Sequence, residues 1–289
     1  DCIADSPPFG VTAGEDWFGC RWLWDTGTNG FMQDPKAPFI CTDITQWEKQ
    51  VTFPDIDKVE WERLSKPVVE SYDPDRMTQL MLQTGVFERM HSLLGFEDTI
   101  MAMYDEPEAF HEFMEAITEH RVKVMKKAIR YYKPDIITNM DDYGTQNGPM
   151  MSKEMFREFI KPYTKRVIDA IHEEGVKYMH HSCGNITLLF DDMVEMGMDA
   201  ITAVAPINDV DGMIAKYGDS IVWDGGMNTN GVMDVIGVSE EEVRAEARRA
   251  MQKLGRTGSY VAGGYCNSVS EKIVMDEVQK YGSKFYQYN

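Results

Sequence analysis

From residue 76 onward, short apolar runs alternate with longer amphipathic stretches. The apolar runs are bounded by Gly, Asp and Asn, which is typical of buried strands, and the stretches between them have the period of helices. Strand followed by helix, repeated with short loops, predicts a parallel sheet with right-handed crossovers and hence an α/β fold. The predicted strands are residues 79–85, 135–140, 176–181, 199–204, 220–226 and 258–264.

The predicted helices include residues 106–133, 152–175 and 239–255. In the last of these, Ser239 is followed three residues later by Glu242, which is the pattern of a capping box. Gly255 occupies the position expected for a C-cap glycine. We therefore expect this helix to begin at Ser239 and end at Gly255.

The first 75 residues have many aromatic residues and prolines and no sustained period. They predict short strands, turns and one short helix that form an N-terminal cover and supply the remaining strands. The βα turns contain neither G-x-G-x-x-G nor G-x-x-x-x-G-K-[ST], which disfavours a nucleotide-binding open sheet. We expect a (β/α)8 TIM-type barrel, with residues 1–289 as a single domain and 1–75 as cover and part of the barrel.

Composition narrows the classes of partner. With 29 Lys and Arg against 48 Asp and Glu, the net charge of −19 disfavours nucleic acid and anionic membranes as partners. No apolar run is long enough to span a membrane, and the five cysteines show no disulfide spacing, so we expect a cytoplasmic protein. The chain begins with Asp1, which is compatible with residues missing before it, and a homodimer is left open.

Polar residues at the predicted strand ends are the candidates for chemistry. In a parallel barrel these ends converge on one mouth, where the βα loops carry the reactive groups. The candidates are Asn139, Asp141, Asp142, His180, His181, Ser182, Cys183, Asp224, Asn228, Tyr265, Cys266 and Asn267.

His181 and Cys183 are two residues apart, so on a continuing strand both side chains point to the same side and His180 points away. Cys266 ends another predicted strand. One imidazole and two thiolates suit Zn²⁺ and leave a fourth position open for substrate, as in catalytic zinc sites. The alternative, that these are ordinary core residues, stays open at this point.

The remaining strand ends allow two interpretations each. Asp141 and Asp142 are adjacent carboxylates that we expect to repel each other and so to raise each other's pKa, which makes one of them a candidate proton donor. The alternative is an N-cap or a loop hydrogen bond. Asp224 is a candidate ligand-binding residue or a turn former before Gly225 and Gly226. The aromatic residues of "DWFGCRW" (16–22) are candidates for a pocket wall or for packing within the cover.

Several of these segments resemble the uroporphyrinogen decarboxylase superfamily. They are "DDYGTQNGPMMSKEMFREFIKPYTKRVIDAIHEEG", "HHSCGNITLLFDDMVEMGMDAI", "WDGGMNTNGVM" and "EEEVRAEARRAMQKLGRTGSYVAGGYCN", in this order. The resemblance implies a (β/α)8 barrel with its site at the C-terminal mouth. In the corrinoid-dependent methyltransferases of that superfamily, a His-x-Cys and a distant Cys bind zinc, and this pattern falls on His181, Cys183 and Cys266. The arginine-rich N-terminal motif of the true decarboxylases is missing, since Arg21 and Arg63 are isolated.

The resemblance implies two branches of methyl transfer. In the preferred one, Zn²⁺ acts on the ether oxygen of a methoxylated aromatic and cob(I)alamin, held by a separate corrinoid protein, takes the methyl group. Asp141 or Asp142 orients the substrate or supplies a proton, with Asn139 and Tyr265 as further catalytic candidates, and Asp224, Gly225 and Asn228 are predicted to contact the cofactor. The alternatives are transfer from methylcobalamin to a thiol, porphyrinogen decarboxylation, and a non-catalytic tetrapyrrole-binding barrel.

Overall fold

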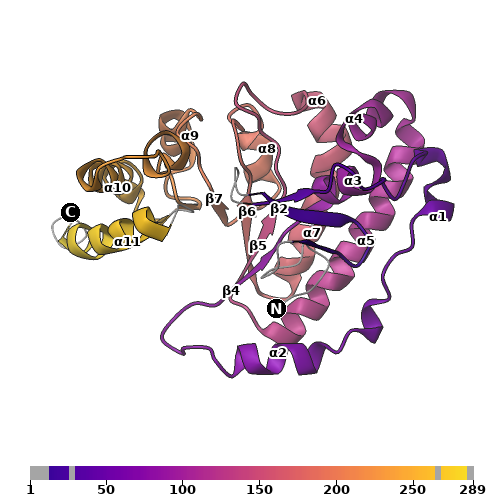
Figure 1. The fold of residues 1–289 in the computed structure, drawn as a ribbon, viewed down its shortest axis with the longest axis horizontal. Coiled ribbons are helices and arrows are strands. Elements are labelled where there is room, and N and C mark those ends of the chain that lie inside the picture. The colour runs from indigo at the N-terminus through magenta and orange to yellow at the C-terminus, as the bar shows by residue number, and fades with distance from the viewer. Residues whose placement is uncertain (1–12, 26–29, 264–267, 285–289) are drawn as a thin grey trace. The chain divides into compact units, whose positions relative to one another are not determined.

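The computed structural model describes residues 13–25, 30–263 and 268–284, which form two compact units. The first unit consists of the described residues up to Asp142 together with Met151–Tyr178 and Glu195–Gly197. The second contains Tyr143–Met150, Met179–Val194 and the described residues from Met198 onward. Figure 1 shows the elements of both.

The N-terminal part of the first unit contains a small antiparallel sheet. Within the part of the chain that the structure describes, its strands β1 (Ala13–Glu15), β2 (Arg21–Asp25) and β3 (Gly30–Gln33) pair only with one another. Short helices follow, η1 (Ile44–Gln46), α1 (Trp47–Gln50), η2 (Ile56–Lys58) and α2 (Trp61–Val69). The predicted cover of short strands and a short helix is therefore present, but its described strands form a sheet of their own. That residues 1–75 also contribute to the barrel, and that 1–289 is a single domain, stay predictions.

The alternation of strands and helices begins in the first unit at β4 (Gln79–Leu82), which pairs in parallel with β5 (Ile136–Met140). They are connected by α3 (Val86–Leu94), α4 (Phe96–Asp105) and α5 (Pro107–Tyr132). Helix α5 packs along α7 (Lys161–Glu173), and the two lie side by side in Figure 1. Pro107 stands in the first turn of α5, where its missing N–H is not needed.

The predicted helix 152–175 is present but is not uniform. It starts as α6 (Lys153–Met155), passes through a π-helical turn η3 (Phe156–Ile160) and continues as α7. Ser152 caps its first turn by accepting a hydrogen bond from the Met155 amide. Pro162 in the first turn of α7 has no N–H for an α-helical hydrogen bond, and the π turn lies directly before it.

The second unit contains parallel strands of its own. Residues of β6 (Lys177–His181) from Met179 onward pair with β7 (Ala200–Thr202), which pairs with β8 (Val222–Asp224), which pairs with β9 (Tyr260–Val261), all in parallel. Helices α10 and α11 lie side by side (Figure 1) and enclose a small core that includes Val243, Met251 and Val274. The other elements are α8 (Phe190–Glu195), α9 (Val210–Tyr217), η4 (Thr229–Met233), α10 (Glu240–Leu254), η5 (Gly255–Thr257), α11 (Ser268–Glu277) and η6 (Val278–Gly282).

The local sequence signals agree with the structure in most places. Each of the six strands β4–β9 lies within one of the predicted ranges, and the capping box of Ser239 and Glu242 is present at the start of α10. Gly255 is the C-cap but keeps a right-handed conformation and begins a 3₁₀ turn. The left-handed glycine that ends this segment is Gly258, with φ +74°. Among the described residues, the helices are all too short or too polar to span a membrane.

Candidate functional site

His181 and Cys183 come together at the end of β6. The sulfur of Cys183 lies 3.4 Å from Nε2 of His181, although β6 ends at His181 and Cys183 stands in the loop that follows. The imidazole is buried and the thiol is exposed. Zinc bonds of about 2.0 Å to nitrogen and about 2.3 Å to sulfur at a tetrahedral angle require a separation of about 3.5 Å. The pair therefore has the spacing of two ligands of one zinc ion.

A second segment of the same unit holds this strand end. The Tyr143 amide donates to Ser182 Oγ over 2.9 Å, and the Asn185 amide donates to the Thr145 carbonyl over 2.8 Å. Gly184 has φ +75°, and a Cβ on it would overlap the backbone of Gly144. The backbone approach is thus close enough to require glycine on both sides, and it fixes the loop that carries Cys183.

Asn208 completes the support of this loop, and it was not among the candidates selected from the sequence. Its Nδ2 donates to the Gly184 carbonyl over 3.0 Å and its Oδ1 accepts from the Ile186 amide over 2.8 Å. The available signal was its place in the "PIND" loop that follows β7, which is another strand end. His180, predicted to point away from the pair, is fully buried and stacks on Tyr143 with ring centroids 5.0 Å apart.

Asp141 is a helix cap within the first unit. Its carboxylate is fully buried and accepts hydrogen bonds from the Glu88 amide at 2.8 Å and the Phe87 amide at 3.3 Å, in the first turn of α3. Favourable contacts between a carboxylate and the N-terminus of a helix stabilise both. The alternative interpretation of this residue as a cap describes its contacts, although the helix that it caps is α3 and not the one that follows it in the chain.

Asp142 and Glu88 form a pair of neighbouring acids. The Asp142 amide donates to Glu88 Oε1 over 3.3 Å, and Asp142 is only partly buried. Burial, followed by repulsion from Asp142 and Asp141, raises the pKa of Glu88 well above its usual value. Glu88 was not among the sequence candidates, although an acid in the first turn after a strand end is a recognisable signal.

Asn139 is engaged inside the first unit. Its Oδ1 accepts from the Arg121 guanidinium at 2.6 Å, and it also bonds the buried Tyr178 hydroxyl. Burial raises the pKa of Tyr178. Because its side-chain amide bonds Arg121 and Tyr178, Asn139 links α5 to the parallel strands and is poorly placed to contact a substrate.

At the end of β8 the backbone turns sharply. Gly225 and Gly226 have φ +90° and +72°, and the Gly225 carbonyl accepts from the Tyr260 hydroxyl over 2.7 Å. Burial raises the pKa of Asp224, against the hydrogen bonds from Thr202 and the Gly225 amide. Asn228 caps η4 by accepting from the Gly231 amide at 2.9 Å, so its side chain is used locally. Tyr265 and Cys266 lie outside the described residues.

The aromatic residues of "DWFGCRW" pack within the cover. Phe18 and Trp22 are buried, and the Trp22 indole donates to Asp16 over 3.0 Å. Trp17 meets Trp61 edge-on at 6.1 Å. The packing interpretation therefore describes these rings, and they lend no support to an aromatic substrate.

Comparison with known proteins identifies the family. The family model for uroporphyrinogen decarboxylase (URO-D) matches residues 68–270, more than half of the chain. The chain belongs to the URO-D family. Among solved structures it is similar to a methyltransferase from Methanosarcina mazei, at 15% identity and a TM-score of 0.71 over 92% of this chain and 76% of that one. This likeness confirms the fold, and family membership confirms the expected superfamily and its (β/α)8 class.

Two further comparisons add little. The 1.8 Å crystal structure of the IOLI protein with a bound zinc atom aligns at 9% identity and a TM-score of 0.41, over 80% of this chain and 82% of that one. A similarity that low carries no argument about fold or metal. No curated protein matches this sequence.

Proposed function

We propose that this URO-D family member is a zinc-containing, corrinoid-dependent methyltransferase. The observation that carries the proposal is the 3.4 Å separation of Cys183 Sγ and His181 Nε2, which suits two ligands of one zinc ion. The methyltransferase from Methanosarcina mazei, which shares the fold, supports the choice of reaction class.

In this proposal His181, Cys183 and the predicted third ligand Cys266 hold the zinc. The metal would supply Lewis acid chemistry at the heteroatom that carries or receives the methyl group, and cobalamin on a separate corrinoid protein would exchange that group. The loop 143–148 and Asn208 hold Ser182 and Gly184, the two neighbours of Cys183 in the chain, and so support the loop that carries this ligand. Asp142, partly exposed and next in the chain to Tyr143, is the better candidate of the two aspartates for a proton donor, since Asp141 is a buried cap.

We propose a methoxylated aromatic as the methyl donor and, as the alternative, a thiol as the methyl acceptor. Both reactions use the same ligands, because zinc equally stabilises a phenolate or a thiolate. The protein is proposed to act in the cytoplasm, where the corrinoid partner and a reducing environment for cob(I)alamin would both be found.

The test is anaerobic incubation of the zinc-loaded protein with free cob(I)alamin and a series of methoxylated aromatics. The visible spectrum of methylcobalamin should develop with wild type and fail to develop with Cys183→Ser. A parallel reaction of methylcobalamin with small thiols, read as loss of the same spectrum, selects the alternative branch. Turnover of a porphyrinogen by protein stripped of zinc, with neither methyl transfer observed, would overturn the proposal.

A further inference from the structure

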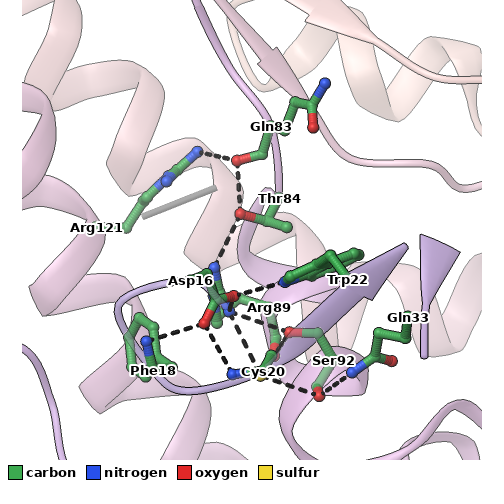
Figure 2. A network of polar contacts seen from close by, with 10 residues as sticks. All are labelled: Asp16, Phe18, Cys20, Trp22, Gln33, Gln83, Thr84, Arg89, Ser92 and Arg121. Atoms are coloured by element: carbon green, nitrogen blue, oxygen red, sulfur yellow. Dashed lines mark hydrogen bonds and ion pairs between the residues drawn. The ribbon is translucent and has the colours of Figure 1, made fainter. Parts of the chain in front are cut away.

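A buried ion pair connects the N-terminal segment to helix α3. Arg89 Nη1 lies 2.6 Å from Asp16 Oδ2, and the side chains are 4% and 0% exposed (Figure 2). A charge pair removed from water is costly to bury and often contributes less to stability than a matched apolar contact. Its presence 73 residues apart in the sequence therefore calls for a role beyond packing.

Residues of the N-terminal hairpin β1–β2 orient the carboxylate of Asp16. Asp16 Oδ1 accepts from the amides of Phe18 at 2.9 Å and Cys20 at 3.0 Å, and Oδ2 accepts from the Trp22 indole at 3.0 Å. Hydrogen bonds within residues 16–22 thus orient the carboxylate of Asp16 toward Arg89. Phe18 also covers the guanidinium, with its ring centroid 4.5 Å from Arg89 Cζ.

The guanidinium of Arg89 connects Asp16 to the loop after β4. Arg89 Nη2 donates to Thr84 Oγ1 over 3.2 Å, and the Thr84 hydroxyl donates to the Gln83 carbonyl over 2.6 Å. The same carbonyl accepts from Arg121 at 3.0 Å, and Arg121 in turn holds Asn139. Figure 2 shows this continuous chain of contacts from Asp16 to Arg121.

The backbone of Thr84 has a strained conformation, which its hydrogen bonds to Arg89 and to the Gln83 carbonyl help to hold. Its φ of +60° lies in the left-handed region, which is unfavourable for a β-branched residue. The next residue, Gly85, donates its amide to the Met140 carbonyl and has no room for a Cβ beside the Asp141 carboxyl group. The conformation at Thr84 therefore determines how α3 begins and how the segment 140–142 is seated against it.

We propose that Asp16 and Arg89 act through Thr84 as positioning residues for the strand-end segment that carries Asp141 and Asp142. The N-terminal segment is then part of the machinery that orders the site and not only a cover. This inference rests on the proposed function for its catalytic consequence, whereas the ordering of residues 83–88 can be measured without any substrate.

The test compares Thr84→Val, which removes the hydroxyl and keeps the shape, with Thr84→Ser, which keeps the hydroxyl. Hydrogen exchange at the Gly85 and Glu88 amides should become about tenfold faster in Thr84→Val and return to the wild-type rate in Thr84→Ser, with exchange in α10 unchanged. Arg89→Lys, which keeps the charge beside Asp16 and loses the forked guanidinium that also reaches Thr84, should resemble Thr84→Val. The double variant should show little further effect, because the two residues act through one contact.

Activity separates positioning from stability. In the assay for methylcobalamin, Thr84→Val should lower kcat about tenfold with the KM for the methyl donor and the zinc content unchanged. Arg63→Lys makes the same substitution as Arg89→Lys, but in an exposed ion pair with Glu60, and serves as its matched control. It should leave both the exchange rates and kcat unchanged.

The outcomes are distinct. Unchanged exchange at Gly85 and Glu88 in Thr84→Val, or an equal increase in α10, overturns the inference. Faster local exchange with unaltered kcat in an active enzyme also overturns it. If wild type transfers no methyl group under any condition, the proposed function fails, and the ordering role is then decided by the exchange rates alone.

Discussion

The sulfur of Cys183 and Nε2 of His181 are 3.4 Å apart at the end of β6, one side chain exposed and the other buried. A buried imidazole beside an accessible thiol leaves one side of the pair open, which is the arrangement that a catalytic metal needs. Contacts from residues 143–148 to Ser182, Gly184 and Asn185 hold the loop that carries Cys183.

Removing a ligand should remove the zinc. We expect His181→Ala and Cys183→Ala, and Cys266→Ala if it is the third ligand, to lower zinc affinity at least about 100-fold, because each ligand contributes a bond that water replaces poorly. Metal analysis after dialysis against a weak chelator measures this. Cys41→Ala, a buried thiol elsewhere, should keep wild-type zinc, and retention of zinc by Cys183→Ala would contradict the site.

Asp141→Ala should destabilise the protein by about 2 kcal/mol, since it leaves two amides of the first turn of α3 without their acceptor in a buried place. Urea denaturation measures the change. The control is Asp98→Ala, an exposed residue in the first turn of α4, for which a change under about 0.5 kcal/mol is expected. Equal effects of the two substitutions would show that the buried carboxylate is no cap.

Gly184→Ala should cost more stability than Gly258→Ala. Both glycines have nearly the same left-handed φ, at +75° and +74°, so the conformational strain of about 1 kcal/mol is common to both. A Cβ at Gly258 meets nothing within 4 Å, whereas one at Gly184 overlaps Gly144. We expect Gly184→Ala also to weaken zinc binding, and thermal unfolding with metal analysis checks both effects. Equal losses of stability would argue against the close backbone contact.

The raised pKa of Glu88 predicts a pH dependence of stability. Between its usual pKa of 4.5 and the raised value, the folded protein binds more protons at this carboxyl than the unfolded chain. The free energy of unfolding should therefore fall as pH rises from 4.5 through the folded pKa. Glu88→Gln, which keeps an acceptor for the Asp142 amide, should lose less stability than wild type over this range.

Urea denaturation from pH 4 to pH 8 measures the difference between the two proteins. The matched control is Glu112→Gln, which neutralises an exposed acid on α5 and should run parallel to wild type. A Glu88→Gln profile that also runs parallel to wild type would contradict the raised pKa.

Local patterns in the sequence were enough to predict the parallel strands and the start of one helix. Period and punctuation located the strands from β4 to β9, and the capping box located the start of α10, because these features depend on residues a few positions apart. Strand alternation also predicted that His181 and Cys183 face the same side, and their side chains do meet, although Cys183 lies two residues beyond the end of β6.

Contacts between distant residues required the tertiary structure. Asp141 was one of two adjacent acids in the sequence, and only the structure shows that it caps a helix that starts 55 residues earlier (141 − 86). The sequence also did not predict the ion pair of Asp16 with Arg89, or the close backbone contact of Gly144 with Gly184. Periodicity reports which face of an element is buried, whereas the partner of a buried polar group is chosen by how the elements pack, and the sequence order does not record that choice.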